Sequence, residues 1–207
     1  MNLRARVSYL TLVVLLFMIE IAAAGLMWLD HSIDGTIVHG LLGLVMFVIG
    51  VTACTAAQQR PVTMFNPLKA GHIVTLMFAN VGMLMVIAIH DCDHMRQAMG
   101  WGYRFTLSLL LINVIVYLPN LLSLYLIAHG RKVGIWATLI SGLLIGGSFL
   151  KLHLLGAWLP AWGPWNHSFF VLKVDVISWW ILVITAVAGV LIALIAAEVY
   201  GETRAKV

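Results

Sequence analysis

The sequence predicts an all-α integral membrane protein, a compact bundle of six transmembrane helices that forms a single domain over residues 1–207. Of its residues, 62% are hydrophobic and only 10% are Asp, Glu, Lys or Arg, with a mean hydropathy of +1.03. A soluble domain carries about 25% charged residues. The apolar runs match the roughly 20 residues that a helix needs to cross a bilayer, and none shows the alternation typical of β-barrel strands.

Six apolar stretches are predicted to span the membrane, at residues 7–29, 35–57, 71–91, 104–128, 133–152 and 174–198. The first follows Arg4 and Arg6 as a secretory signal peptide would, but it continues to Leu29 and is expected to remain as a helix. The second and third lie between polar connections. The fourth contains Pro119, the only proline inside a predicted span.

Small residues at helical spacing in the last two stretches predict seams where helices pack closely. These residues are Gly142, Gly146, Gly189, Ala193 and Ala197.

The basic residues predict the orientation, because cytoplasmic loops are enriched in Lys and Arg. Eight of the 12 lie in the N-terminus, the 58–70 loop, the 129–132 turn and the C-terminal tail. Both termini are therefore expected in the cytoplasm, in a cytoplasmic or inner membrane. The basic residues form no stripe with interleaved aromatics, which argues against nucleic acid. The expected partners are the lipid bilayer and other membrane subunits.

The stretch IHDCDHMRQ, residues 89–97, concentrates metal-ligand side chains on the extracytoplasmic side. On a helix that continues past the membrane edge, His90 and His94 share a face with Asp91. Imidazole with a carboxylate suits a transition metal, with copper or zinc expected here. The alternative is that these polar residues mark where the helix leaves the lipid, with an aspartate paired to Arg96.

Other residues on the same side are candidates to complete the metal site. His39 and His153 are predicted as further ligands, and Asp93 as a residue that orients a ligating histidine. A single outer haem b, held by His39 and His90, is another alternative. No CxxCH motif for covalent haem is present.

Three polar residues deep inside the predicted spans are further candidates. Glu20 lies about nine residues from the outer end of the first span, and Asn80 and Asn113 lie in the third and fourth. A carboxyl group in hydrocarbon costs several kcal/mol, so Glu20 should face the bundle. These three residues are candidates for a proton relay, or for residues that contact the metal ligands and orient them. The alternative is a protonated Glu20 that is hydrogen-bonded to one of the asparagines.

The connection after the fifth span, LLGAWLPAWGPWNHSFF, is rich in tryptophan. Its prolines prevent a regular helix, and indoles favour the membrane interface, so it is expected to lie on the membrane surface. The alternative is a lid over the cluster of histidines and aspartates, with Trp162, Trp165 and His167 as its candidate residues.

The function predicted from these patterns is a multi-pass subunit with an outer metal site, part of a membrane metalloenzyme or redox complex. One alternative is a non-catalytic accessory or assembly subunit. Another is a proton- or metal-ion-coupled transporter that uses Glu20. The sequence contains no GxSxG, HExxH, P-loop or GxGxxG motif, so whether the chain is an enzyme stays open.

Overall fold

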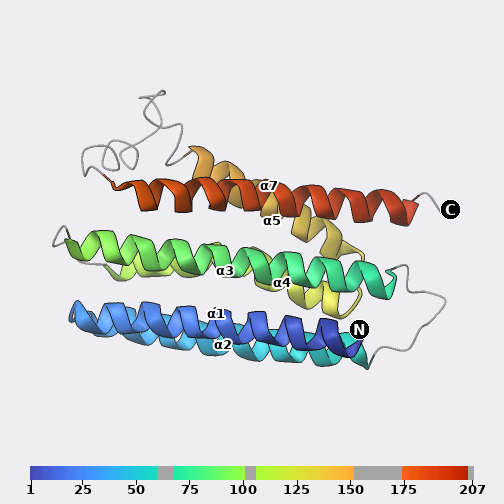
Figure 1. Ribbon diagram of the computed structural model, residues 1–207, viewed down its shortest axis with the longest axis horizontal. Helices are drawn as coiled ribbons and strands as arrows, with labels where there is room; N and C mark the ends of the chain where they lie inside the picture. The colour runs from blue at the N-terminus through green and yellow to red at the C-terminus, as the bar shows by residue number, and fades with distance from the viewer. Residues whose placement is uncertain (60–67, 101–105, 152–173, 205–207) are drawn as a thin grey trace.

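The computed structural model describes residues 1–59, 68–100, 106–151 and 174–204, which form six helices and no strand (Figure 1). The helices are α1 (Leu3–Leu29), α2 (Ile33–Gln58), α3 (Ala70–Gly100), α4 (Leu107–Ala128), α5 (Val133–Phe149) and α7 (Val176–Arg204). Each overlaps one of the predicted apolar stretches. The prediction of an all-helical protein is therefore confirmed.

Four of the described helices, α1, α2, α3 and α7, are long and apolar enough to cross a membrane. The described apolar segments of α4 and α5, Asn113–Ala128 and Val133–Phe149, are shorter. Large hydrophobic side chains on the outer faces of the bundle are exposed, as is typical of surfaces that contact lipid.

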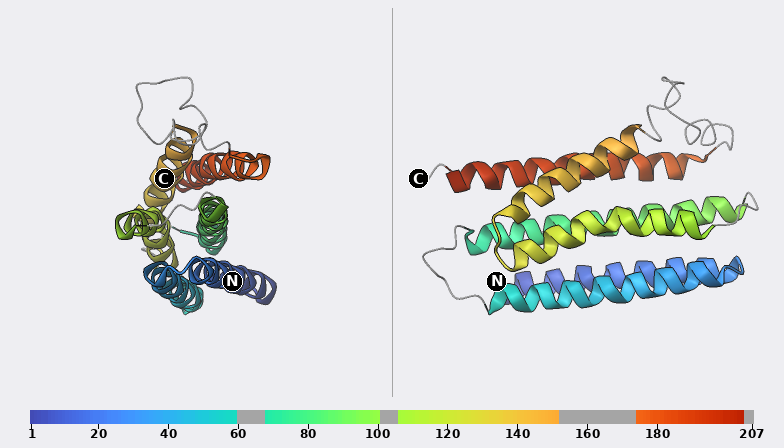
Figure 2. Two further views of the ribbon diagram at one scale, coloured as in Figure 1. Left: turned by 90° about the vertical axis from the view of Figure 1, so that its left-hand side faces the viewer. Right: turned by 180° about the vertical axis from the view of Figure 1, so that it is seen from behind.

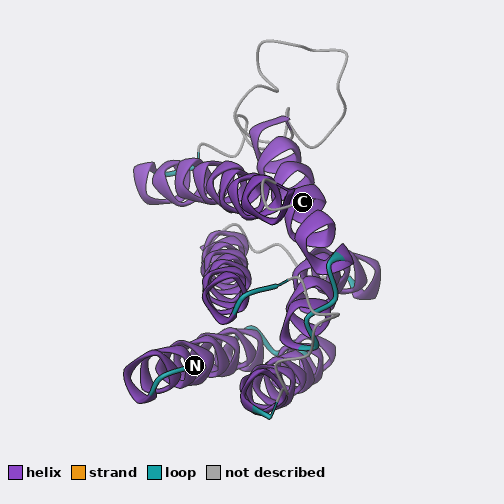
Figure 3. Ribbon diagram, turned by 90° about the vertical axis from the view of Figure 1, so that its right-hand side faces the viewer, coloured by secondary structure: helices purple, strands orange, loops and turns teal. Residues whose placement is uncertain are grey.

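The helices pack in two rows of three. One row contains α1, α3 and α7, and the other contains α2, α4 and α5 (Figures 2 and 3). Across the rows α1 packs on α2, α3 on α4, and α5 on α7. Among the four long apolar helices, α3 is the most deeply buried, so its polar residues face neighbouring helices.

The start of α1 and the end of α7 lie at one end of the bundle (Figure 1), which we call the terminal end. The opposite end, where α1 and α3 finish and α7 begins, is the far end. The predicted cluster of histidines and aspartates, together with Asp34 and Asp175, belongs to the far half of the bundle.

Helix α3 is longer than predicted, because it continues for nine residues beyond position 91. The predicted span ends at position 91, and the continuation of the helix past the membrane edge, on which the shared face of His90 and His94 depends, is present. In the structure, Asp93 and Arg96 form an ion pair within the last turns of α3, and both contact Ser178 of α7. These contacts satisfy the polar groups without ending the helix.

The seam of small residues between α5 and α7 is present. A Cβ atom added to Gly142 would lie 2.5 Å from the carbonyl oxygen of Gly189, and one added to Gly189 would lie 2.5 Å from the backbone nitrogen of Gly146. Ala193 belongs to the same contact, because its backbone nitrogen would lie 2.9 Å from that Gly142 Cβ. Ala197 is exposed, so its predicted place in the seam is wrong.

Candidate functional site

Four polar side chains from four helices meet in the apolar interior of the far half. They are Glu20 of α1, His39 of α2, Asp91 of α3 and Tyr117 of α4, and we call them the buried quartet. Glu20, His39 and Tyr117 are completely buried, and Asp91 is 6% exposed. An isolated charge in such surroundings costs several kcal/mol, so the contacts within the quartet determine whether the bundle can hold it.

The first half of the quartet is a hydrogen-bonded pair between α1 and α2. His39 Nδ1 lies 3.0 Å from Glu20 Oε2, and neither side chain is exposed. The sequence allows this approach through Gly43, one turn after His39, where a Cβ atom would lie 2.8 Å from the Cβ of Glu20. A larger residue at position 43 would therefore push the two helices apart at the level of the pair.

The second half joins α3 to α4. The Tyr117 hydroxyl donates a hydrogen bond of 2.7 Å to Asp91 Oδ2. Glu20 lies within electrostatic range of both Asp91 and Tyr117, and His39 within range of Asp91. The two pairs therefore form one electrostatically coupled group.

Two atoms of the quartet have no hydrogen-bond partner among the residues that the structure describes. They are Glu20 Oε1 and His39 Nε2, and both are buried. The hydrogen bond between the Glu20 carboxylate and Nδ1 of His39 fixes the orientation of the imidazole. It leaves Nε2 of His39 to take up a proton or a ligand.

A charge count indicates what the quartet can do chemically. With the imidazole of His39 protonated and both carboxylates ionised, its net charge is negative by one unit. Uptake of one proton makes it neutral, and low-dielectric surroundings favour the neutral form. The protons of closely spaced groups belong to the set as a whole, so the charge of the quartet depends on all of its side chains together.

The predicted metal ligands are only partly brought together. The rings of His90 and His94 lie side by side, with centroids 5.6 Å apart, and His90 also packs edge-on against Phe149 of α5, 4.5 Å away. Asp91 makes its hydrogen bond to Tyr117. Among the described residues no group of three or more His, Cys, Asp or Glu side chains could hold a metal ion. The metal site stays a prediction.

Asp93 has structural contacts at the far end. Its carboxylate accepts a hydrogen bond of 2.7 Å from Arg96 Nη2 and another from the Ser178 hydroxyl. Arg96 also forms an ion pair of 3.0 Å with Asp175, the residue before α7. The pairing of an aspartate with Arg96, expected as the alternative to metal binding, is therefore present for Asp93.

The asparagines proposed for the relay do not contact Glu20 through any described hydrogen bond. Asn80 is completely buried, and its Nδ2 donates to Thr138 Oγ1 of α5 over 2.9 Å. Asn113 is half-buried on α4. The carboxyl of Glu20 instead pairs with His39, which the sequence had suggested only as a metal ligand. His153 and the lid candidates Trp162, Trp165 and His167 lie outside the described residues.

Sequence reasoning missed Tyr117. Tyrosine in a transmembrane segment usually marks the membrane interface, whereas Tyr117 lies ten residues inside α4 and is completely buried. A hydroxyl at the same depth as a buried carboxyl on a neighbouring helix was the available signal. Recognising it requires knowing that α4 packs on α3, which the sequence does not give.

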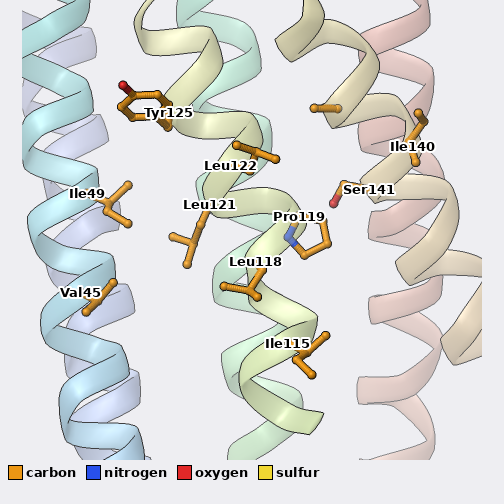
Figure 4. A pocket seen from close by; sticks show the side chains of 11 residues that line it. Val45, Ile49, Ile115, Leu118, Pro119, Leu121, Leu122, Tyr125, Ile140 and Ser141 are labelled. Carbon is orange, nitrogen blue, oxygen red and sulfur yellow. The ribbon is translucent and has the colours of Figure 1, made fainter. Parts of the chain in front are cut away.

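A hollow on the outside of α2, α4 and α5 has a volume of about 680 Å³ (Figure 4). Its walls are almost entirely apolar side chains, including Val45, Ile49 and Leu122. Tyr125 and Ser141 are the lining residues that carry a hydroxyl group. It carries no charged side chain, so it suits hydrocarbon chains of lipid and is not a site for an ionic substrate.

No protein-family model matches this chain, and neither a curated protein nor a solved structure is similar enough to count as a match. The function therefore has to be argued from the buried quartet and its surroundings.

Proposed function

We propose that the chain is an integral membrane protein that exchanges protons through the buried quartet, as part of proton movement across the membrane. The observation that carries this proposal is the pair of buried carboxyl groups, Glu20 and Asp91, each hydrogen-bonded to a titratable side chain of another helix. Ionisable residues inside membrane helices are costly to keep, and they commonly mark proton or ion paths.

In this proposal all six helices cross the membrane, and both termini lie on the cytoplasmic side of a cytoplasmic or inner membrane. The excess of basic residues at the terminal end supports this orientation. The quartet then lies nearer the extracytoplasmic surface, where protons enter or leave.

A reconstituted system tests the proton exchange. The purified protein is placed in liposomes with a pH-sensitive dye inside, and a pH difference is imposed across the membrane. Glu20→Gln keeps the size of the side chain but removes its charge, and we expect it to lower the proton flux at least ten-fold. The matched control is Glu198→Gln, on the exposed surface of α7. Equal flux in the wild type and Glu20→Gln would contradict the proposal.

The second candidate function is a metal-binding subunit of a membrane metalloenzyme or redox complex. The rings of His90 and His94 are adjacent, which favours this function. The hydrogen bond between the Glu20 carboxylate and His39 favours it too, because a histidine that binds a metal through one ring nitrogen commonly bonds a carboxylate through the other. Elemental analysis and a visible spectrum of the purified protein would detect copper, zinc or haem. We expect the double variant His90→Ala, His94→Ala to lose the metal and His129→Ala at the terminal end to keep it. Full retention in the double variant would exclude this site.

A further inference from the structure

We propose that a file of buried polar side chains between α3, α4 and α5 binds water and conducts protons from the quartet toward the terminal end. This polar file consists of Asn120 and Ser123 of α4, Thr138 and Ser141 of α5, and Asn80 of α3. All five side chains are completely buried. The inference rests on the proposed proton exchange and adds the route by which the proton leaves the quartet.

The register of α4 against α5 brings members of the file to the same level. The two helices are antiparallel around the 129–132 turn, and Gly134 of α5 lies against Ile127 of α4. Seven residues further along α5 and seven back along α4, Ser141 lies level with Asn120. By the same count Thr138 lies level with Ser123.

The file begins one turn of α4 from Tyr117 of the quartet and ends at Asn80 of α3. Asn120 follows Tyr117 by three residues on α4, a rise of about 4.5 Å toward the terminal end. Ser123 follows after another three residues. Asn80 of α3 joins at that level through its hydrogen bond of 2.9 Å to Thr138. Polar groups thus recur at each turn along the contact of α4 with α5, where Ser141 also borders the outer hollow.

Several atoms of the file have hydrogen-bonding capacity that the described residues do not use. They are Asn120 Nδ2 and Oδ1, Ser141 Oγ and Asn80 Oδ1. Each buried polar group without a partner costs about 1–3 kcal/mol. The set includes both donors and acceptors at neighbouring levels, which is the arrangement that holds internal water, since a buried water makes about three hydrogen bonds.

Water and hydroxyl groups can pass a proton along such a file with the balance kept at every step. Each oxygen accepts a proton on one lone pair and releases another proton to the next oxygen. The flanking residues of α3, among them Leu84 and Ile87, are buried and apolar, so the file is the polar route through this part of the interior.

A pair of titratable side chains lies at the terminal end of α3. His72 Nε2 is 2.8 Å from Glu202 Oε2 of α7, and the Glu202 side chain is 54% exposed. His72 precedes Asn80 by eight residues, about 12 Å along the helix. In this proposal the pair releases the proton to the solution, and water carries it past the buried apolar residues Ile73, Leu76 and Met77 that separate the pair from Asn80.

The first test measures water at Asn120 directly and does not depend on proton flux. Protein labelled with ¹⁵N-asparagine is placed in hydrated bilayers and studied by water-edited solid-state NMR, with the Asn120 side-chain signal assigned from Asn120→Leu. We expect magnetisation to pass from water to this buried amide, and to weaken by at least half in Ser141→Ala. An Asn120 amide that receives no magnetisation from water would overturn the proposal.

The second test separates the path from the site. We expect Asn120→Leu to lower proton flux into liposomes at least ten-fold while the infrared carboxyl bands of the quartet still respond to pH. Thr185→Val is the control, because Thr185 of α7 is equally buried but lies outside the file. Flux that Glu20→Gln abolishes and Asn120→Leu leaves unchanged would overturn the path alone. Flux that survives Glu20→Gln, or is absent in the wild type, would overturn both proposals.

Discussion

Tyr117 tests how strongly the quartet depends on a single hydroxyl. Tyr117→Phe keeps the ring but removes the donor to Asp91, which would leave a buried carboxyl without that hydrogen bond. We expect the free energy of unfolding to fall by about 1–3 kcal/mol. Thermal unfolding in detergent, followed by circular dichroism, measures the change. Tyr125→Phe is the matched control on the same helix, because Tyr125 is 55% exposed, and it should change stability by less than about 0.5 kcal/mol.

Arg96 sets the ionisation of Asp175 at the far end. Its guanidinium, helped by the backbone N–H of Ser178, lowers the pKa of Asp175 from 3.8 to about 2. A carboxyl with a lowered folded-state pKa stabilises the fold above its unfolded pKa, and this contribution is lost as the pH falls through the folded value. The contact between α3 and the start of α7 should therefore persist at neutral pH and weaken only between about pH 4 and pH 2.

Replacing the arginine checks this assignment. In Arg96→Gln the pKa of Asp175 should rise toward its ordinary value, because the charged donor is gone. Carboxyl ¹³C shifts of labelled aspartate, followed from pH 6 to pH 2, report the change. A midpoint near 2 that survives Arg96→Gln would show that the backbone hydrogen bond at Ser178 is sufficient by itself.

At the scale of the helices, close approach of α5 and α7 requires glycine at specific positions. Gly189→Ala would place a methyl group 2.5 Å from the backbone nitrogen of Gly146, and backbone cannot move aside as a flexible side chain can. We expect this variant to lose about 1–3 kcal/mol of stability from overpacking. Gly147→Ala on α5 is the control, because nothing lies within 4 Å of the added atom. It should be neutral or stabilising by up to about 1 kcal/mol.

The same comparison shows what helix spacing can and cannot predict. A pattern of small residues indicated that α5 and α7 would pack closely, because interfaces between membrane helices favour residues that let the backbones approach. The pattern could not say where the seam ends, and Ala197 faces outward. Likewise, the sequence could not predict the contact of Asp93 with α7, because its partner Ser178 lies 85 residues further along the chain.

For the whole molecule, the sequence predicted the helical class and the six segments, because long apolar runs are a local property. It also predicted that Glu20 would face the interior, from the cost of a carboxyl in hydrocarbon. It did not predict the quartet. The pairing of Glu20 with His39 and of Asp91 with Tyr117 depends on which helices are neighbours and on their register, and neither is encoded in any short stretch of sequence.

The last prediction concerns how many helices cross the membrane. If all six cross, the turn between α4 and α5 lies on the cytoplasmic side with both termini. If α4 and α5 do not cross, this turn lies outside, while the termini remain inside. The termini therefore cannot distinguish the two arrangements, and the 129–132 turn can.

Single cysteines in a background without the two native ones, Cys54→Ala and Cys92→Ser, measure the side directly. His129→Cys reports on the α4–α5 turn, and Asp34→Cys on the start of α2; both positions are exposed. In intact cells we expect a membrane-impermeant maleimide to label the thiol at position 34 and not the thiol at 129. After permeabilisation both should react. Labelling at both 34 and 129 in intact cells would leave only four crossings. The α4 and α5 segments, and with them Tyr117 and most of the polar file, would then not cross the bilayer as both proton proposals require.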